Sequence, residues 1–259
     1  MIETAALPTV RYVQHVMGMP ISLALRGRHT DDGRTAAAWA DTMAELRVLD
    51  RIFSTYRRDS HVSRLDSGVI DLADCPAEVA EVIALGEAAE HASGGAFSVR
   101  LPGADGVPRL EPSGVVKGWA VDRAAAPLRA LPDTDFCLSA GGDMVCRTHQ
   151  PNAAPWRIGV EHPADPMRLV AVIPVLTGAV ATSGATHRGQ HIVDPRTGRP
   201  ATGVASVTVV GDSLTWADID ATAAYAMGVG AVDWLSRQPI LAALVVADNG
   251  TTTTVLPDH

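Results

Sequence analysis

The sequence predicts an α+β protein in which helices pack on a mixed or antiparallel sheet. Apolar residues recur at three-to-four-residue steps over residues 35–54 and 77–95, which is typical of amphipathic helices. Valine-rich runs bounded by Gly, Asp or Asn indicate strands. Because the two kinds of segment intermingle without a strict βαβ repeat, a parallel sheet is disfavoured.

Each element follows from its own pattern. Residues 13–27 alternate enough to predict a strand. The helix over 35–54 carries an apolar stripe of Trp39, Met43, Leu46, Leu49 and Phe53. The helix over 77–95 ends at Gly94-Gly95, and a third helix over 118–131 is broken by Pro127. Further segments are four strands over 135–147, 168–184, 204–212 and 243–256, and an alanine-rich helix over 213–230.

Composition excludes several classes of protein. The 259 residues are 47% hydrophobic and 19% charged, enough to bury a sizeable core, and the net charge of -8 argues against a nucleic-acid partner. No apolar run reaches the roughly 18 residues of a membrane span, and the first residues lack a secretory-signal pattern, so a cytoplasmic protein is expected. Cys75, Cys137 and Cys146 are widely spaced and odd in number, which predicts buried free thiols. Residues 102–114, rich in Pro and Gly, are the one candidate linker.

Two short segments indicate ligand chemistry. In SAGGDMV, residues 139–145, the turn Gly141-Gly142 lets the backbone approach a ligand and Asp143 can accept a donor; a plain hairpin turn is the alternative. Lys117 precedes a glycine and a helix start, so a cation and a helix N-terminus can face one anion. A solvated lysine is the alternative there.

Asp218 and Thr222 stand four residues apart near the start of the alanine-rich helix and therefore share one face, whereas Asp220 points away. Hard oxygen ligands on one face suit Mg²⁺. The alternative is that these acids only complement the helix dipole.

The segment TSGATHRGQHIVDPRTG, residues 182–198, places His187 and His191 four apart. Gly184, Gly189 and the Asp-Pro step disfavour the continuous helix that an HxxxH zinc site needs. A phosphate-binding turn, a histidine base and an irregular polar loop remain open on the residues alone.

Taken in order, STYRRDS (54–60), VVKGWAVDRAA (115–125), SAGGDMV, ATSG (181–184) and HIVDPRTG (191–198) resemble the ApbE family of FAD:protein FMN transferases, over about residues 16–230. The resemblance implies an ApbE-like, T-fold-related domain over residues 1–259, or two subdomains meeting at an FAD cleft. It also implies that FAD is cleaved with Mg²⁺, that FMN passes through a phosphoester to a threonine of an acceptor flavoprotein, and that AMP leaves. A monomer or homodimer is expected.

The resemblance also implies residue roles. Mg²⁺ ligands are the backbone carbonyl of Ala125 and the side chains of Asp218 and Thr222. His191 is the general base, and His187 tolerates substitution better. The implied FAD contacts are Met17, Tyr56, Gly94, Gly95, Ala96, Lys117, Asp122, Asp143, Thr182, Ser183, Gly184 and Ile192.

The chain departs from the family pattern in three places. Met17-Gly18-Met19 stands where MGT is common, and residues 94–100 read GGAFSVR where the family commonly has GGAFDPT. The segment over 98–114 is shortened, which affects one wall of the FAD pocket. Two alternatives therefore stand beside the transferase: an FAD pyrophosphatase that yields FMN and AMP, and a non-catalytic FAD-binding protein.

Overall fold

A computed structural model describes residues 9–103, 105–149, 153–184 and 192–257. Its centre is an eight-stranded sheet in which every neighbouring pair of strands is antiparallel, in the order β1-β2-β5-β6-β9-β12-β13-β14. The strands are β1 (Val10–Val16), β2 (Met19–Gly27), β5 (Thr134–Ala140), β6 (Asp143–Arg147), β9 (Gly178–Gly184), β12 (Val204–Gly211), β13 (Ala242–Ala247) and β14 (Thr252–Val255). The predicted α+β class with an antiparallel sheet is confirmed.

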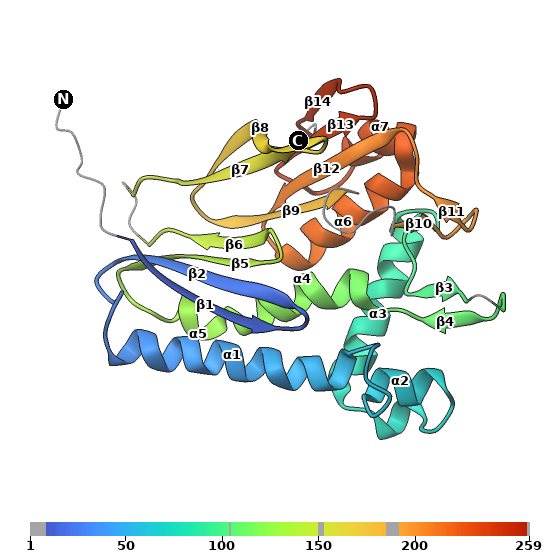
Figure 1. The fold of residues 1–259 in the computed structure, drawn as a ribbon, viewed down its shortest axis with the longest axis horizontal. Coiled ribbons are helices and arrows are strands. Elements are labelled where there is room, and N and C mark those ends of the chain that lie inside the picture. Colours follow the sequence, from blue (N-terminus) through green and yellow to red (C-terminus); the bar gives the residue numbers. More distant parts are fainter. Residues whose placement is uncertain (1–8, 104, 150–152, 185–191, 258–259) are drawn as a thin grey trace.

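Helices pack against one face of the sheet, and a two-stranded ribbon covers part of the other (Figure 1). The helices described are α1 (Gly33–Phe53), α2 (His61–Asp66), α3 (Ala77–Ala92), α4 (Ser113–Ala124), α5 (Ala126–Arg129), α6 (Leu214–Met227) and α7 (Ala231–Leu235), with 3-10 turns at Leu72–Asp74 and Gly228–Gly230. The ribbons described are β3 (Arg100–Pro102) with β4 (Pro108–Leu110), β7 (Trp156–His162) with β8 (Asp165–Val175), and β10 (Val193–Asp194) with β11 (Arg199–Pro200). None of the described helices has the length and apolarity needed to cross a membrane.

The main hydrophobic core lies between the sheet and the helices. All five residues of the predicted stripe on α1 are buried in it. Asp32 begins this helix, because its side chain accepts hydrogen bonds from the backbone of Arg34 and Thr35. A smaller core under the β7–β8 ribbon contains Cys146, Ile158, Val175, Val180 and Val210.

Several expected strands are in fact hairpins. Residues 13–27 form the end of β1 and all of β2, because the backbone reverses at Met17 and Gly18, with φ of 55° and 71°. Positive φ at both central residues suits a tight two-residue hairpin turn. The segments over 135–147 and 243–256 are likewise hairpins, whereas 168–184 divides into β8 and β9, which belong to different sheets.

The candidate linker over 102–114 is instead structured. It contains β4 and the first turn of α4, which begins at Ser113 rather than at the expected residue 118. The backbone N–H of Leu110 donates to the Asp66 carboxylate at 2.7 Å, which ties β4 to α2. The sequence pattern also missed β7, α2 and α7.

Candidate functional site

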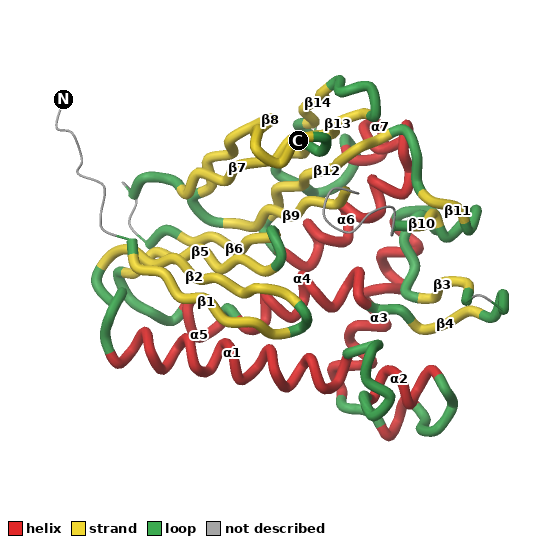
Figure 2. Tube along the Cα trace, in the orientation of Figure 1, coloured by secondary structure: helices red, strands yellow, loops and turns green. Residues whose placement is uncertain are grey.

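Three predicted segments meet at one end of the sheet, where the β1–β2 turn, the β5–β6 turn and the end of β9 lie near the start of α4 (Figure 2). Gly141 in the β5–β6 turn donates its N–H to the Pro20 carbonyl at 3.3 Å. The Thr182 N–H on β9 donates to the Asp143 carboxylate at 2.9 Å. Met17, Asp143 and residues 182–184 are therefore brought to the same end of the fold.

Lys117 on α4 joins two buried carboxylates from different elements. Its ammonium lies 3.1 Å from Asp218 Oδ1 on α6 and forms a second ion pair with Asp143 Oδ2 at the start of β6. Both aspartates are only 1% exposed. One positive and two negative charges leave this Lys117 cluster with a net charge of about -1 when all three groups are ionised.

The electrostatics of the cluster favour an additional cation. Burial acts to lower the pKa of Lys117, but the carboxylates of Asp218 and Asp143 outweigh it and hold that pKa above its usual value. Burial, opposed by Lys117 and assisted by the nearby Asp143, raises the pKa of Asp218 to about 7. One ammonium balances only one of the two carboxylates, so a bound metal ion would stabilise the ionised form of the pair.

One hydroxyl pair adjoins the Lys117 cluster. Thr222 lies one helical turn after Asp218 on α6, and its Oγ1 is 3.0 Å from the Ser183 Oγ on β9. A second pair, Thr182 Oγ1 and Thr208 Oγ1 at 2.9 Å, lies on the opposite face of the sheet, because side chains alternate along β9 and β12. Thr208 carries no signal in the sequence that identifies it in advance, because its place depends on the register of β9 with β12.

These groups fit Mg²⁺ better than zinc. Within the described ranges, no group of three or more His, Cys, Asp or Glu is arranged to hold a metal ion. What the site offers is hard oxygen donors, from Asp218 and Thr222, in a cluster of net negative charge. Mg²⁺ is commonly held by one or two carboxylates, with water and phosphate completing its coordination.

Gly118 is a residue that the motif contained but that sequence reasoning gave no role. Its N–H donates to Asp218 Oδ2 at 3.1 Å, which fixes the carboxylate next to Lys117. A Cβ at this position would lie 2.6 Å from the Leu214 carbonyl oxygen and 3.0 Å from Asp218 Cβ. Glycine is therefore required for α4 to approach α6 closely enough to build the site.

Two residues of the same motif lie elsewhere on α4. The Asp122 carboxylate accepts a hydrogen bond from the side chain of Arg129. It also accepts hydrogen bonds from Ser213 and Thr215 at the N-terminus of α6. Ala125 ends α4, seven residues and about 10 Å along the helix from Gly118. That distance along the helix separates it from the Lys117 cluster, and its carbonyl accepts the Arg129 N–H at 3.0 Å.

The other predicted FAD contacts have varied surroundings. Met17 packs partly against the core, whereas Tyr56, after α1, is 99% exposed. Gly94 and Gly95 form the turn after α3 with φ of 59° and 83°. A Cβ on Gly95 would lie 3.5 Å from Arg196 Cγ, so this turn adjoins the DPRTG segment. Ala96 is buried and Ile192 packs partly on the core. His187 and His191 lie outside the described residues.

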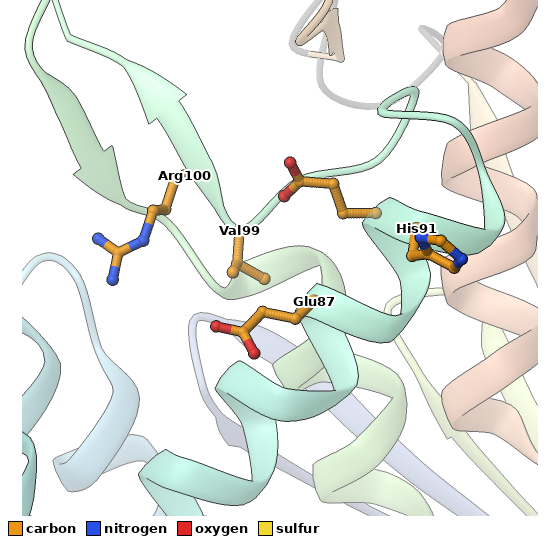
Figure 3. Close-up of a pocket in the computed structure, with 5 residues that line it drawn as sticks. Glu87, His91, Val99 and Arg100 are labelled. Atoms are coloured by element: carbon orange, nitrogen blue, oxygen red, sulfur yellow. The ribbon is translucent and has the colours of Figure 1, made fainter.

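A pocket in another part of the surface contains none of the predicted residues. It lies between α3 and the segment leading into β3, and Figure 3 shows Glu87 and His91 on the helix opposite Val99 and Arg100. Glu90 completes its lining. Its two carboxylates outnumber the single guanidinium of Arg100, and this excess of negative charge makes the pocket a poor site for the phosphates of a dinucleotide.

Taken together, the geometry defines an α+β protein with an oxygen-rich cluster of net negative charge at one end of an antiparallel sheet. The ApbE family model matches residues 17–103 and 103–245, and this chain therefore belongs to the ApbE family. The predicted family is confirmed.

Relatives and solved structures agree with the family. An FAD:protein FMN transferase of Vibrio cholerae is 36% identical over 45% of this chain, and one of Rhodobacter capsulatus is 34% identical over 55% of it. The matched regions span only 38% and 29% of those relatives' lengths. The apo flavinyl transferase ApbE of Pseudomonas stutzeri has the same fold, with a TM-score of 0.80, 22% identity, and coverage of 98% of this chain and 97% of that one. The ApbE protein of Thermotoga maritima gives a TM-score of 0.79 at 21% identity, covering 96% and 97% of the two chains.

Proposed function

We propose that this protein is a Mg²⁺-dependent FAD:protein FMN transferase. In this proposal FAD is cleaved between its two phosphates, FMN becomes linked through a phosphoester to a threonine of an acceptor flavoprotein, and AMP leaves. The observation that carries the proposal is the buried Lys117 cluster beside the Ser183–Thr222 hydroxyl pair. The naming of its relatives as FAD:protein FMN transferases supports the choice of substrate.

The first set of proposed roles concerns the metal ion. Asp218 and Thr222 would hold Mg²⁺, with Lys117 and the Gly118 N–H keeping the Asp218 carboxylate in place. When bound, the metal ion neutralises pyrophosphate charge and stabilises the leaving AMP. Ala125 is left out of this set, because it lies at the opposite end of α4, about 10 Å along the helix from Gly118.

The remaining roles concern the phosphates and the proton. Backbone and hydroxyl groups of residues 182–184, at the end of β9, would bind the phosphate side of FAD. His191 would take the proton from the acceptor threonine Oγ as the bond to phosphorus forms. General-base catalysis of this kind contributes roughly 10²–10⁴-fold.

The test is incubation of the protein with FAD, Mg²⁺ and a threonine-containing candidate acceptor, followed by denaturation and mass spectrometry of the acceptor. FMN that stays on the denatured acceptor, and that is absent when EDTA replaces Mg²⁺, is the expected result. Free FMN with no labelled acceptor from a panel of candidates would instead indicate the pyrophosphatase. Neither product would contradict the proposal and leave a non-catalytic FAD-binding protein.

A further inference from the structure

The sheet contains a pair of thiols with no role in the proposed reaction. Cys137 on β5 faces Cys146 on β6, and the Cys146 thiol donates to Cys137 Sγ at a sulfur–sulfur distance of 3.5 Å. All three cysteines of the chain are free, as expected, but only Cys146 is fully buried; Cys75 and Cys137 are partly exposed. Cys75, on a separate segment, lies outside this pair.

The strand register places the two cysteines where a cross-strand disulfide fits. Gly141 and Gly142 form a two-residue turn with φ of 58° and 101°, closed by the pair Ala140 and Asp143. In such a hairpin the closing pair exchanges hydrogen bonds and the pairs alternate from there. Cys137 and Cys146 are the fourth pair and therefore do not exchange hydrogen bonds. Their Cα atoms are expected about 4.5 Å apart, within the range that a disulfide spans.

The surroundings of the two thiols differ in a way that suits thiol–disulfide exchange. The hydrogen bond from Cys146 lowers the pKa of Cys137 against the opposing effect of burial, and the charges of Arg11 and Arg26 lower it further. The same hydrogen bond, together with burial, raises the pKa of Cys146. Cys137 is thus the more exposed and more easily ionised thiol, whereas Cys146 is 1% exposed.

We propose that Cys137 and Cys146 are a redox-active thiol pair that forms a reversible disulfide by exchange with small-molecule disulfides. The Cys137 thiolate attacks one sulfur of the small disulfide, whose S–S bond breaks and releases one small thiol. Cys146 then loses its proton and its sulfur attacks Cys137 Sγ, which breaks the mixed disulfide and releases the second small thiol. Two protein thiols are oxidised and one small disulfide is reduced to two thiols.

This inference is independent of the proposed transferase activity. Alternation along β6 puts Cys146 on the face that packs under the β7–β8 ribbon, whereas Asp143 points to the helix-covered face and Lys117. The disulfide therefore forms on the opposite side of the sheet from the Lys117 cluster. Closing a short loop within one hairpin is expected to raise the melting temperature of the oxidised protein.

The experiment uses full-length Cys75→Ser protein, in which the pair is the only source of thiols, equilibrated with increasing ratios of oxidised to reduced glutathione in EDTA. Intact mass spectrometry should show the loss of two hydrogens without a retained glutathione, reversed by dithiothreitol. Peptide mapping should locate the bond between residues 137 and 146. A raised melting temperature of the oxidised form checks that the native fold holds the bond.

Two matched variants on the same background test the order of attack. With Cys146→Ser, Cys137 should keep a glutathione adduct, because no second thiol displaces it. With Cys137→Ser, Cys146 should stay reduced and unmodified. Both thiols remaining free in folded Cys75→Ser protein at the most oxidising ratio, while the denatured protein oxidises, would overturn the proposal. Accumulation of a stable glutathione adduct in that protein would overturn it as well.

Discussion

Helix α4 contacts α6 at two places that each contain an aspartate, and the two places differ in how charge is balanced. At Asp122, the carboxylate meets Arg129 at 3.0 Å and three donors from Ser213 and Thr215 at the N-terminus of α6. At Lys117, a single ammonium serves two buried carboxylates. The negative charge of Asp122 is balanced by Arg129 and by the hydrogen-bond donors of α6. The Lys117 cluster, in contrast, keeps a net negative charge.

One motif thus contains two residues with different electrostatic surroundings. KGWAVD contains both Lys117 and Asp122, and a motif match treats them alike. The hydrogen bonds assign Asp122 to capping α6, a role that the fold explains without a ligand. The predicted FAD contact of Asp122 stays a prediction, and the two roles give different results on substitution.

The largest effect on stability is expected for Lys117→Met. Among the described residues Lys117 is the cation of this cluster, and removing it leaves two buried aspartates without an ionic partner, which should lower the free energy of unfolding by about 3–5 kcal/mol. Urea unfolding measures this, with Lys117→Arg as the control that keeps the charge and loses less. A loss below about 1 kcal/mol for Lys117→Met would mean that the ion pairs are no stronger than surface pairs.

Asp122→Ala should cost less. It removes the carboxylate that accepts hydrogen bonds from the N-terminus of α6 and leaves the donors of Ser213 and Thr215 unpaired, for about 2 kcal/mol of unfolding free energy. Transfer of FMN per folded molecule and its dependence on FAD concentration should stay unchanged. A rise in the FAD concentration needed, with little loss of stability, would instead support the direct FAD contact.

Thr222→Val tests the hydroxyl beside Asp218 with little change in volume. The free energy of unfolding should fall by about 1 kcal/mol, because Ser183 loses one hydrogen-bond partner. The Mg²⁺ concentration for half-maximal FMN transfer should rise about 10-fold or more. Thr208→Val, which removes the hydroxyl that pairs with Thr182, is the matched control and should leave the Mg²⁺ requirement unchanged.

Arg196→Ala is expected to give the smallest effect, because its ion pair with Asp194 is partly exposed. The loss should be about 0.2–1 kcal/mol. The Arg196 hydrogen bond lowers the pKa of Asp194. The contribution is therefore present above the unfolded pKa of about 3.9 and disappears as pH falls through the lower folded value. Unfolding of both proteins at about pH 6 and about pH 3 checks this; an equal difference at the two pH values would contradict it.

Hydrophobic periodicity and the positions of glycines predicted much of the fold. The stripe on α1, the end of α3 and the extent of α6 follow from local pattern. The hairpins were missed where a turn interrupts a continuous run of strand-forming residues, as at Met17 and Gly18. The sequence did not predict β7, because this strand depends on pairing with β8 rather than on its own composition.

The site was predictable in its parts but not in its assembly. Lys117, Asp143 and Asp218 were each identified from separate motifs, and the resemblance assigned Asp218 to the metal. Their meeting depends on the close approach of α4 to α6 at Gly118, which no local pattern contains. The distinction between Asp122 and Asp218 likewise requires the tertiary partners of each carboxylate.

The most direct test compares two aspartates on α6 that stand two residues apart. Asp218 contacts Lys117, whereas Asp220 is 7% exposed and burial raises its pKa to about 7. Each is replaced by Asn, and FMN formed from FAD, free or protein-linked, is measured over a range of Mg²⁺ concentrations. Asp218→Asn should lose about 100-fold or more of the rate, whereas Asp220→Asn should follow the unsubstituted protein. Equal losses in both variants, or none in Asp218→Asn, would contradict a metal-dependent site built on the Lys117 cluster.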